Sequence, residues 1–410
     1  MIAETFDLAT TVPAEPFAEG KVRIARAVEA HRGEILELSH RIHADPEPAF
    51  EEFHASAAVA EALRRHGYVV EHPVGSLATA VRGRLAGGRG GDRPRIGILA
   101  EYDALPGLGH GCGHNTMAAS GVGAAIALAE MTPELPGEIV FLGTPAEERG
   151  SGKAHMIRDG LFEGLDAALL FHPSDTSYVT CRLLASEDVY VTFHGLQAHA
   201  ASEPWMGRNA LDALIVLFSA VGLWRQQLRP DVRVHGIVQE GGSSANIIPA
   251  RAKAWFMVRS PREAEYLEMR ERFREMCEAA AAATGCTVEV AFDGGASTMN
   301  HNATIGDRFA GNMAAYGVTD LPPSDYLGSS DMGNVSQILP TIHPSIAICA
   351  EGTPGHSIDF REAAISPLGD EVTLLAATLV AQTAYELFAD PTLVEAAWQE
   401  FRSERPAPPA

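Results

Sequence analysis

Short apolar runs alternate with helical spacing through the first part of the chain. Apolar residues from Ile24 to Ile42 predict one helix that ends before Pro46, and a second helix is expected from about Phe50 to Gly67. Alternation predicts a strand over Leu77 to Leu85. Further buried strands and an intervening helix are predicted at Arg95 to Ala100, Thr116 to Met131, Glu138 to Gly143 and Ala167 to Phe171. This order predicts an α/β fold with a mixed, largely parallel sheet flanked by helices, in which sites lie at the carboxyl ends of strands.

The pattern changes after Phe171. The segment SEDVYVTFHG alternates polar and apolar residues, as a half-exposed antiparallel strand does. The elements expected after it are a helix over Asn209 to Leu228, strands over Val232 to Val238 and Ala252 to Arg259, and a long helix from about Pro261 to Gly285. We therefore predict an inserted α+β domain over 184–294, within a first domain that comprises 1–183 and 295–410 and ends in a helix over Pro367 to Phe388.

Composition narrows the classes of protein that fit. The 410 residues contain 31 Lys and Arg against 53 Asp and Glu, a net charge of −22, which opposes nucleic-acid binding. No apolar run approaches the roughly 18 residues of a membrane helix, so we expect a soluble protein with no membrane partner. Residues 1–20 lack the features of a secretory signal and are expected to form a partly disordered arm, which predicts a cytoplasmic protein. Five scattered cysteines do not form a disulfide framework.

Residues with chemical potential follow each predicted strand of the first domain. The loop EYDALPGLGHGCGHN contains Asp103, Cys112 and His114, and its glycines allow tight bends. The next loops contain the pair Glu147 and Glu148 in TPAEERGSG, then His172 in FHP, and finally His356 in EGTPGHS. Each motif alone has an ordinary explanation, such as a glycine turn, a solvated helix start or a satisfied histidine.

Together these loops predict a metal site, because the loops of one parallel sheet meet at the same edge. Thiolate, imidazole and carboxylate are the ligands of a two-metal site of zinc character, with Mn²⁺ or Co²⁺ as other possible ions. The predicted ligands are Cys112, His114, Glu148, His172 and His356. Asp103 would orient His114 through its other ring nitrogen, and Glu147 would stay free to transfer protons.

The ordered motifs resemble the peptidase M20 metallohydrolase family over about residues 20–390. Within it, the chain is similar to the amidohydrolase branch of p-aminobenzoyl-glutamate hydrolase subunits and aminoacylase-1-like dipeptidases. The resemblance implies a zinc-peptidase-like catalytic domain with an inserted lid and dimerisation domain. It also implies that Cys112 bridges two metal ions, with His114 and His172 on one ion and Glu148 and His356 on the other. The branch often has CGHD where this chain has CGHN, which leaves no acidic role for Asn115.

The same resemblance implies functional residues in the inserted domain. His199 in GLQAHAASEP would reach the active site from the lid, commonly across a dimer interface, and bond the substrate carbonyl. Asn246 and Arg259 would hold a substrate carboxylate, for which a guanidinium is chemically suited. Ser330 and Asp331 either touch the site or cap a helix. The expected partners are a small amide substrate bearing a carboxylate and a second copy of the chain.

These residues imply metal-dependent hydrolysis of an amide in a small N-acyl amino acid, dipeptide or aminobenzoyl-glutamate-like substrate. Glu147 would take a proton from the activated water and return it to the leaving amine. One alternative is a cysteine hydrolase with Cys112 as nucleophile, which needs no metal and leaves Glu148, His172 and His356 unexplained. Another is a non-catalytic metal-binding or peptide-binding scaffold of the same fold.

Overall fold

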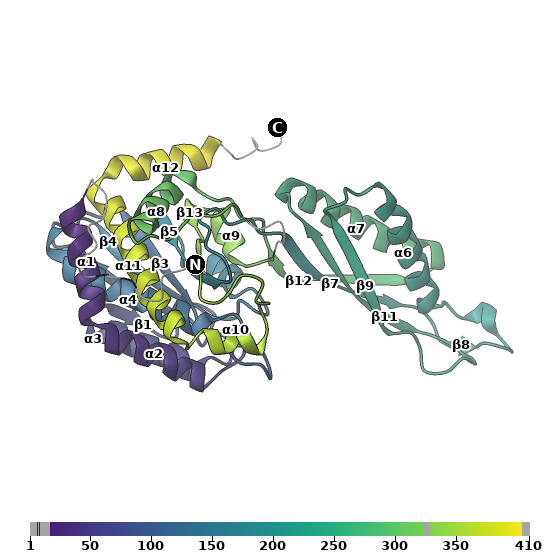
Figure 1. Cartoon of the computed structure of the whole chain (residues 1–410). Coiled ribbons are helices and arrows are strands. Elements are labelled where there is room, and N and C mark those ends of the chain that lie inside the picture. The colour runs from purple at the N-terminus through teal and green to yellow at the C-terminus, as the bar shows by residue number, and fades with distance from the viewer. Residues whose placement is uncertain (1–5, 7, 9–16, 324–327, 404–410) are drawn as a thin grey trace. The chain divides into compact units, whose positions relative to one another are not determined.

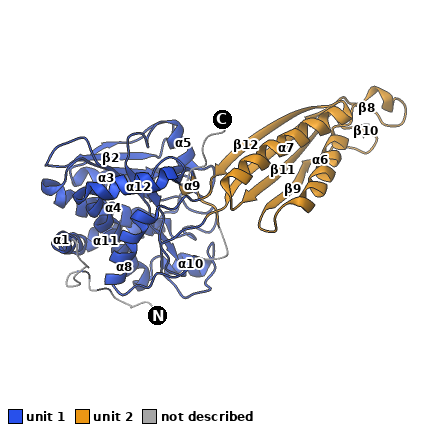
Figure 2. Cartoon of the chain, turned by 90° about the horizontal axis from the view of Figure 1, so that it is seen from above, with its two compact units in different colours: residues 1–182, 299–326, 334–410 blue, residues 183–298, 327–333 orange. Residues whose placement is uncertain are grey.

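The computed structural model describes residues 6, 8, 17–323 and 328–403. The chain divides into two compact units (Figure 2): unit 1 comprises residues 1–182, 299–326 and 334–410, and unit 2 comprises 183–298 and 327–333. The segment 327–333, expected in the first domain, groups with unit 2. The arm expected over residues 1–20 lies largely outside the described residues, although Phe6 and Leu8 are described and buried.

Two helices replace the single helix that the spacing from Ile24 to Ile42 predicted. Helix α1 spans Ala18–Ala30 and α2 spans Arg32–Ala44. The break falls at His31, whose φ of −102° and ψ of 11° depart from helical values. Apolar periodicity does not register this break, because both helices bury their apolar residues in the same core. Helix α3, Phe53–Arg65, ends close to the expected Gly67.

The main sheet of unit 1 has six strands in the order β1-β2-β4-β3-β5-β13 (Figure 1). In that order the strands span Val69–Glu71, Val81–Ala86, Glu138–Thr144, Arg95–Glu101, Ala167–Leu169 and Thr341–Ile342. The pairs β4-β3, β3-β5 and β5-β13 are parallel, and the pairs that join β2 to its neighbours are antiparallel. The predicted mixed, largely parallel sheet flanked by helices is confirmed.

Two buried helices dominate the packing of unit 1. Helix α4, His114–Met131, packs against α11, Pro367–Ala389, and against α1 and α2. Within the described residues α11 is the one helix long and apolar enough to cross a membrane, and 89% of its most apolar window is buried, as in a core helix. The remaining helices of four or more residues outside unit 2's own fold are α5 Gly152–Arg158, α8 Ala303–Ala315, α9 Met332–Ser336, α10 Ile358–Ala363 and α12 Pro391–Ser403.

A small parallel pair extends the carboxyl edge of the main sheet. Strand β6, His172–Ser174, follows β5 after two residues and pairs with β14, Ser345–Ala347. His172 therefore begins a second short strand instead of ending the first. The pairing places the segment after β14, which leads to His356, beside the segment that contains His172.

Unit 2 is built on a four-stranded antiparallel sheet in the order β12-β7-β11-β9. In that order the strands span Thr287–Ala296, Ala185–His194, Arg251–Ser260 and Arg233–Glu240. Helices α6, Ala210–Trp224, and α7, Glu263–Thr284, cover one face of the sheet (Figure 2). Residues of β7 and β11 alternate between buried and partly exposed, because one face packs under these helices. A two-stranded pair, β8 Ala198–His199 with β10 Ile247–Ile248, forms a separate sheet.

Candidate metal centre

The loop between β3 and α4 delivers Cys112 and His114 to the carboxyl edge of the main sheet. Gly113, between them, has a φ of 73°, a left-handed value that glycine adopts without strain. A Cβ there would lie 2.7 Å from Cγ of Pro173, so the close approach to the strand of His172 also requires glycine. His114 is then the first residue of α4 and is fully buried.

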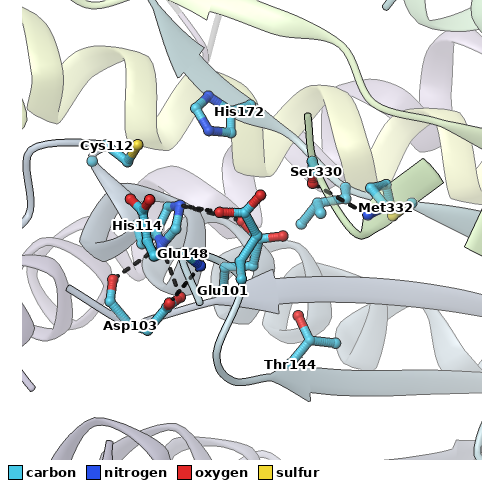
Figure 3. Close-up of polar contacts among 12 residues, drawn as sticks. Glu101, Asp103, Cys112, His114, Thr144, Glu148, His172, Ser330 and Met332 are labelled. Carbon is cyan, nitrogen blue, oxygen red and sulfur yellow. Dashed lines mark hydrogen bonds and ion pairs between the residues drawn. The ribbon is translucent and has the colours of Figure 1, made fainter. Parts of the chain in front are cut away.

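Asp103 fixes the orientation of His114 (Figure 3). Nδ1 of His114 lies 3.0 Å from both the backbone oxygen and Oδ1 of Asp103. Both partners accept hydrogen bonds, so Nδ1 carries the proton and Nε2 presents a lone pair on the opposite side of the ring. The other carboxylate oxygen of Asp103 accepts from the backbone N–H of Glu148 at 2.9 Å. One carboxylate thus joins the loops that follow β3 and β4.

His172 is held in the same way by a backbone carbonyl. Its Nδ1 donates to the backbone oxygen of Pro173 at 2.6 Å, which leaves Nε2 as the acceptor. Its ring lies edge-on to the rings of His114 and His343, with centroids 6.0 and 5.5 Å away. Burial, reinforced by His343 and His114, lowers the pKa of His172 to about 3. The side chain is therefore a neutral imidazole, the form that ligates metals.

The five predicted ligands form two groups that share Cys112. In the first group, one ligand atom each from Cys112, His114 and His172 lie within 4.8 Å of one another. The second group combines Cys112 with Glu148 and His356 under the same limit. Nε2 of His356 lies 2.8 Å from Sγ of Cys112 and 3.5 Å from Oε2 of Glu148. His356 has a φ of 56°, unusual for a residue other than glycine.

The unpaired atoms of this cluster fit a cation. Nε2 of His114, Oε1 of Glu148 and Oε2 of Glu101 are buried and have no hydrogen-bond partner. All three are acceptors in the tautomer that Asp103 selects, and Oε2 of Glu101 lies only 3.4 Å from Nε2 of His114. Acceptors held this close in a buried site repel one another unless a positive charge lies between them. The residues present therefore fit a metal ion.

The ionisation of the site points to the same requirement. Burial lowers the pKa of His114, but the Asp103 carboxylate and other acceptors outweigh burial and hold that pKa well above its usual range. A proton on His114 would supply the positive charge that these acceptors require. Burial raises the pKa of the Cys112 thiol well above its usual range, and Glu148 reinforces the effect. The protein groups alone thus do not generate a thiolate, whereas metal coordination does.

A buried ion pair behind the cluster was missed by sequence reasoning. Lys153 of α5 pairs with Glu101 at the end of β3, and both side chains are 0% exposed. Burial raises the pKa of Glu101, but Lys153 outweighs it and lowers that pKa to about 2. Glu101 stands in the motif that drew attention to this loop, whereas a lysine in the segment GSGKAH gives no signal of burial.

Glu52 is a second buried carboxylate that the sequence did not single out. It precedes α3, and its Oε1 accepts from the backbone N–H groups of Ala146 at 2.8 Å and Phe50 at 3.0 Å, while Oε2 accepts from Thr79 at 2.7 Å. Ala146 has a φ of 61° and directly precedes Glu147. Glu52 therefore stabilises the bend from which the Glu147 and Glu148 pair projects. Burial raises the pKa of Glu52 to about 7.

Asn115 has a structural position. Its amide donates to the hydroxyl of Ser39 at 2.9 Å and to the backbone oxygen of Ala364 at 3.3 Å. These contacts tie the start of α4 to α2 and to the turn before α11.

The lid residues His199 and Asn246 are neighbours in unit 2. β8 pairs with β10, and the backbone N–H of Ala200 donates to the backbone oxygen of Asn246 at 3.0 Å. Nδ1 of His199 accepts from the N–H groups of Ala201 and Ser202 at 3.1 and 3.2 Å. In the neutral ring Nε2 therefore carries the proton, and the exposed side chain presents a hydrogen-bond donor.

Arg259 lies elsewhere in unit 2, near the end of β11, where it pairs with Ser186 and Arg233. Its Nε is buried without a hydrogen-bond partner, so it is a candidate to bind an anion. Ser330 and Asp331 are both buried, and the Ser330 hydroxyl accepts from the N–H of Met332 at 3.2 Å, at the start of α9. This contact is the capping alternative for Ser330.

Comparison with known proteins places this site in a family. Residues 97–377 match peptidase family M20/M25/M40. The Xaa-Arg dipeptidase of Homo sapiens is 34% identical over 404 residues, which cover 93% of this chain and 92% of the relative. One of the p-aminobenzoyl-glutamate hydrolase polypeptides of Escherichia coli is 29% identical, covering 91% of this chain and 93% of the relative.

A solved structure shares the fold. The Bacillus subtilis YxeP protein, described as a dinuclear metal-binding peptidase of the M20 family, superposes with a TM-score of 0.67 at 21% identity, covering 88% of this chain and 99% of that chain. The motifs from EYDALPGLGHGCGHN to EGTPGHS had indicated the same family. The chain therefore belongs to peptidase family M20/M25/M40 and is an enzyme of that family.

Proposed function

We propose that this enzyme hydrolyses the amide bond of small substrates that carry a free carboxylate, using two divalent metal ions. The observation on which the proposal rests is the pair of ligand groups that share Cys112. Cys112, His114 and His172 would hold one ion, and Cys112, Glu148 and His356 the other. The ligand types favour Zn²⁺. When bound, such ions lower the pKa of a coordinated water from 15.7 to about 7 and polarise the substrate carbonyl.

Glu147 is the proposed general base and acid. Its Oε2 lies 3.9 Å from Nε2 of His114, so it stands at the edge of the first ligand group without being one of the five ligands. It takes the proton of the attacking water and passes it to the leaving amine. The Nε2–H of His199 is the proposed donor to the carbonyl oxygen as negative charge develops there.

Dipeptides are the substrates that the relatives favour. The human relative is an Xaa-Arg dipeptidase and the Escherichia coli relative acts on p-aminobenzoyl-glutamate, so both names specify an amide next to a free carboxylate. Arg259 and Asn246 are the proposed binding partners of that carboxylate. We propose dipeptides with a carboxyl-terminal arginine as the first class to test, with N-acyl amino acids and aminobenzoyl-glutamate as the others.

The lid supports a dimeric enzyme. Asn246 lies beyond one end of β11, whereas Arg259 lies eight residues along the strand from Arg251, a distance of roughly 26 Å at about 3.3 Å per residue. One lid therefore cannot place both side chains on a single carboxylate. Exposed apolar side chains on α6 and the edge strand β9 offer a surface for a second copy: Ile215, Leu223, Ile237 and Val238. We propose that each active site receives His199 and Asn246 from the partner subunit.

Chelation combined with one variant tests the proposal. The chelated enzyme should lose turnover of the dipeptide panel and regain it when Zn²⁺ is restored. Glu147→Gln should keep its two metal equivalents while kcat falls by roughly 10² to 10⁴. A cysteine hydrolase would survive chelation but not Cys112→Ser, and a non-catalytic scaffold would release no amine from any substrate. Either result would overturn the proposal.

A further inference from the structure

A second cluster of histidine and carboxylate groups lies on the surface of unit 1, away from the predicted ligands. Ligand atoms of His31, Glu34 and His66 lie within 4.8 Å of one another. Nε2 of His66 is 3.0 Å and Nδ1 of His31 is 3.5 Å from the same oxygen, Oε2 of Glu34. The two imidazole rings stand edge to face with centroids 5.0 Å apart.

Neighbouring charged groups orient two of these side chains from behind. Nε2 of His31 lies 3.0 Å from Oε1 of Glu130, which therefore accepts the ring proton and leaves the Nδ1 lone pair directed at Glu34. The second oxygen of Glu34 accepts from Arg65 at 2.8 Å. A carboxylate behind the imidazole and a cation behind the ligating carboxylate are the arrangement that fixes ligands around zinc.

We propose that His31, Glu34 and His66 form a peripheral Zn²⁺ site. Two imidazoles and one carboxylate are a ligand set of three-residue zinc sites, in which water completes the coordination. The side chains are 27, 28 and 18% exposed, so an ion from solution reaches them and retains water. All three ligands and their supporting groups lie in unit 1, and none belongs to the proposed catalytic site.

The position of the cluster predicts what zinc would do. His31 is the residue that separates α1 from α2, and His66 directly follows α3. Glu34 belongs to α2 and the supporting Glu130 to α4. A bound ion would therefore cross-link the ends of three helices to a fourth and stabilise the folded state, because the unfolded chain does not preform the site.

Zinc stoichiometry tests the proposal. Dialysis of the active-site-loaded enzyme against buffered free Zn²⁺, followed by elemental analysis, should give one equivalent more for the wild type than for His66→Gln or His31→Gln. His40→Gln is the matched control, because His40 is also a surface histidine paired with a carboxylate, Asp370 at 2.7 Å. It should retain the extra equivalent, and kcat should be unchanged in all three variants.

A thermal measurement gives an independent readout. Added Zn²⁺ should raise the Tm of the loaded wild type and of His40→Gln, but not the Tm of His66→Gln. Equal zinc content and equal Tm shifts in the wild type and His66→Gln would show that the cluster is only a network of ion pairs. That result would overturn the proposal and would leave the proposed catalytic function untouched.

Discussion

The two units hold their candidate functional side chains in different ways. In unit 1, His114 is fully buried and Asp103 accepts from its ring nitrogen, while Cys112, Glu148 and His172 converge from separate loops. In unit 2, His199 is exposed at the end of a two-stranded pair, and Nε of Arg259 has no partner. Burial makes the charge balance of unit 1 costly to disturb, whereas the lid groups lose only their own contacts when they are altered.

Removing the cation behind the cluster tests the dependence of unit 1 on charge balance. Lys153→Met leaves Glu101 charged and buried, so we expect a loss of about 3–5 kcal/mol in the free energy of unfolding. Urea unfolding measures the loss. The double variant Glu101→Gln with Lys153→Met should recover most of it, because no charge then remains unpaired. Equal losses in the single and double variants would contradict this explanation.

A smaller effect is expected from Glu52, through pH. Its pKa is about 7 in the folded protein against 4.5 in the unfolded chain, so the folded state binds the extra proton between these values. Stability therefore falls as pH rises from 4.5 to 7 and stays lower above pH 7, by roughly 3 kcal/mol for the 2.5-unit difference. Glu52→Gln should remove this slope.

Unfolding free energies at pH 5 and pH 8 check the prediction for Glu52. Glu61→Gln, which alters an exposed carboxylate on the same helix, is the matched control and should keep the wild-type slope. A slope in Glu52→Gln as steep as that of the wild type would show that Glu52 is ionised throughout.

The lid residues should give the smallest effects, confined to activity. His199→Ala and Arg259→Ala should each reduce kcat/KM by roughly 10- to 100-fold, the usual loss for a hydrogen bond to a charged group, without changing unfolding. Mixing the two variants should restore activity, because one site of each mixed dimer receives an intact His199 and an intact Arg259. Recovery that fails although mixed dimers form would mean that both residues act within one subunit.

Sequence reasoning succeeded where residue identity and order are sufficient. The alternation in β7 and the short apolar runs of β3, β4 and β5 predicted their sheets, because a strand buried on one or two faces requires these patterns. The ligand types at Cys112, His114 and His356 likewise limited the chemistry before any distance was known.

It failed where a distant contact decides the outcome. The break at His31 preserves the apolar spacing of the expected helix, so periodicity cannot detect it. The burial of Lys153 depends on Glu101, 52 residues away, and Glu52 reaches across 94 residues to the N–H of Ala146. The cluster of His31, Glu34 and His66 joins segments whose motifs carry no metal signature.

The order of residue types along the chain was sufficient to specify the family, the sheet and the set of metal-binding side chains, because patterning and ligand chemistry are properties of the residues themselves. Tertiary structure alone decided that Cys112 is shared by two ligand groups, that Lys153 balances Glu101, and that Arg259 and Asn246 stand at opposite ends of a strand. These facts depend on distances and on burial, which raise or cancel electrostatic free energies, and neither quantity exists until the chain has folded.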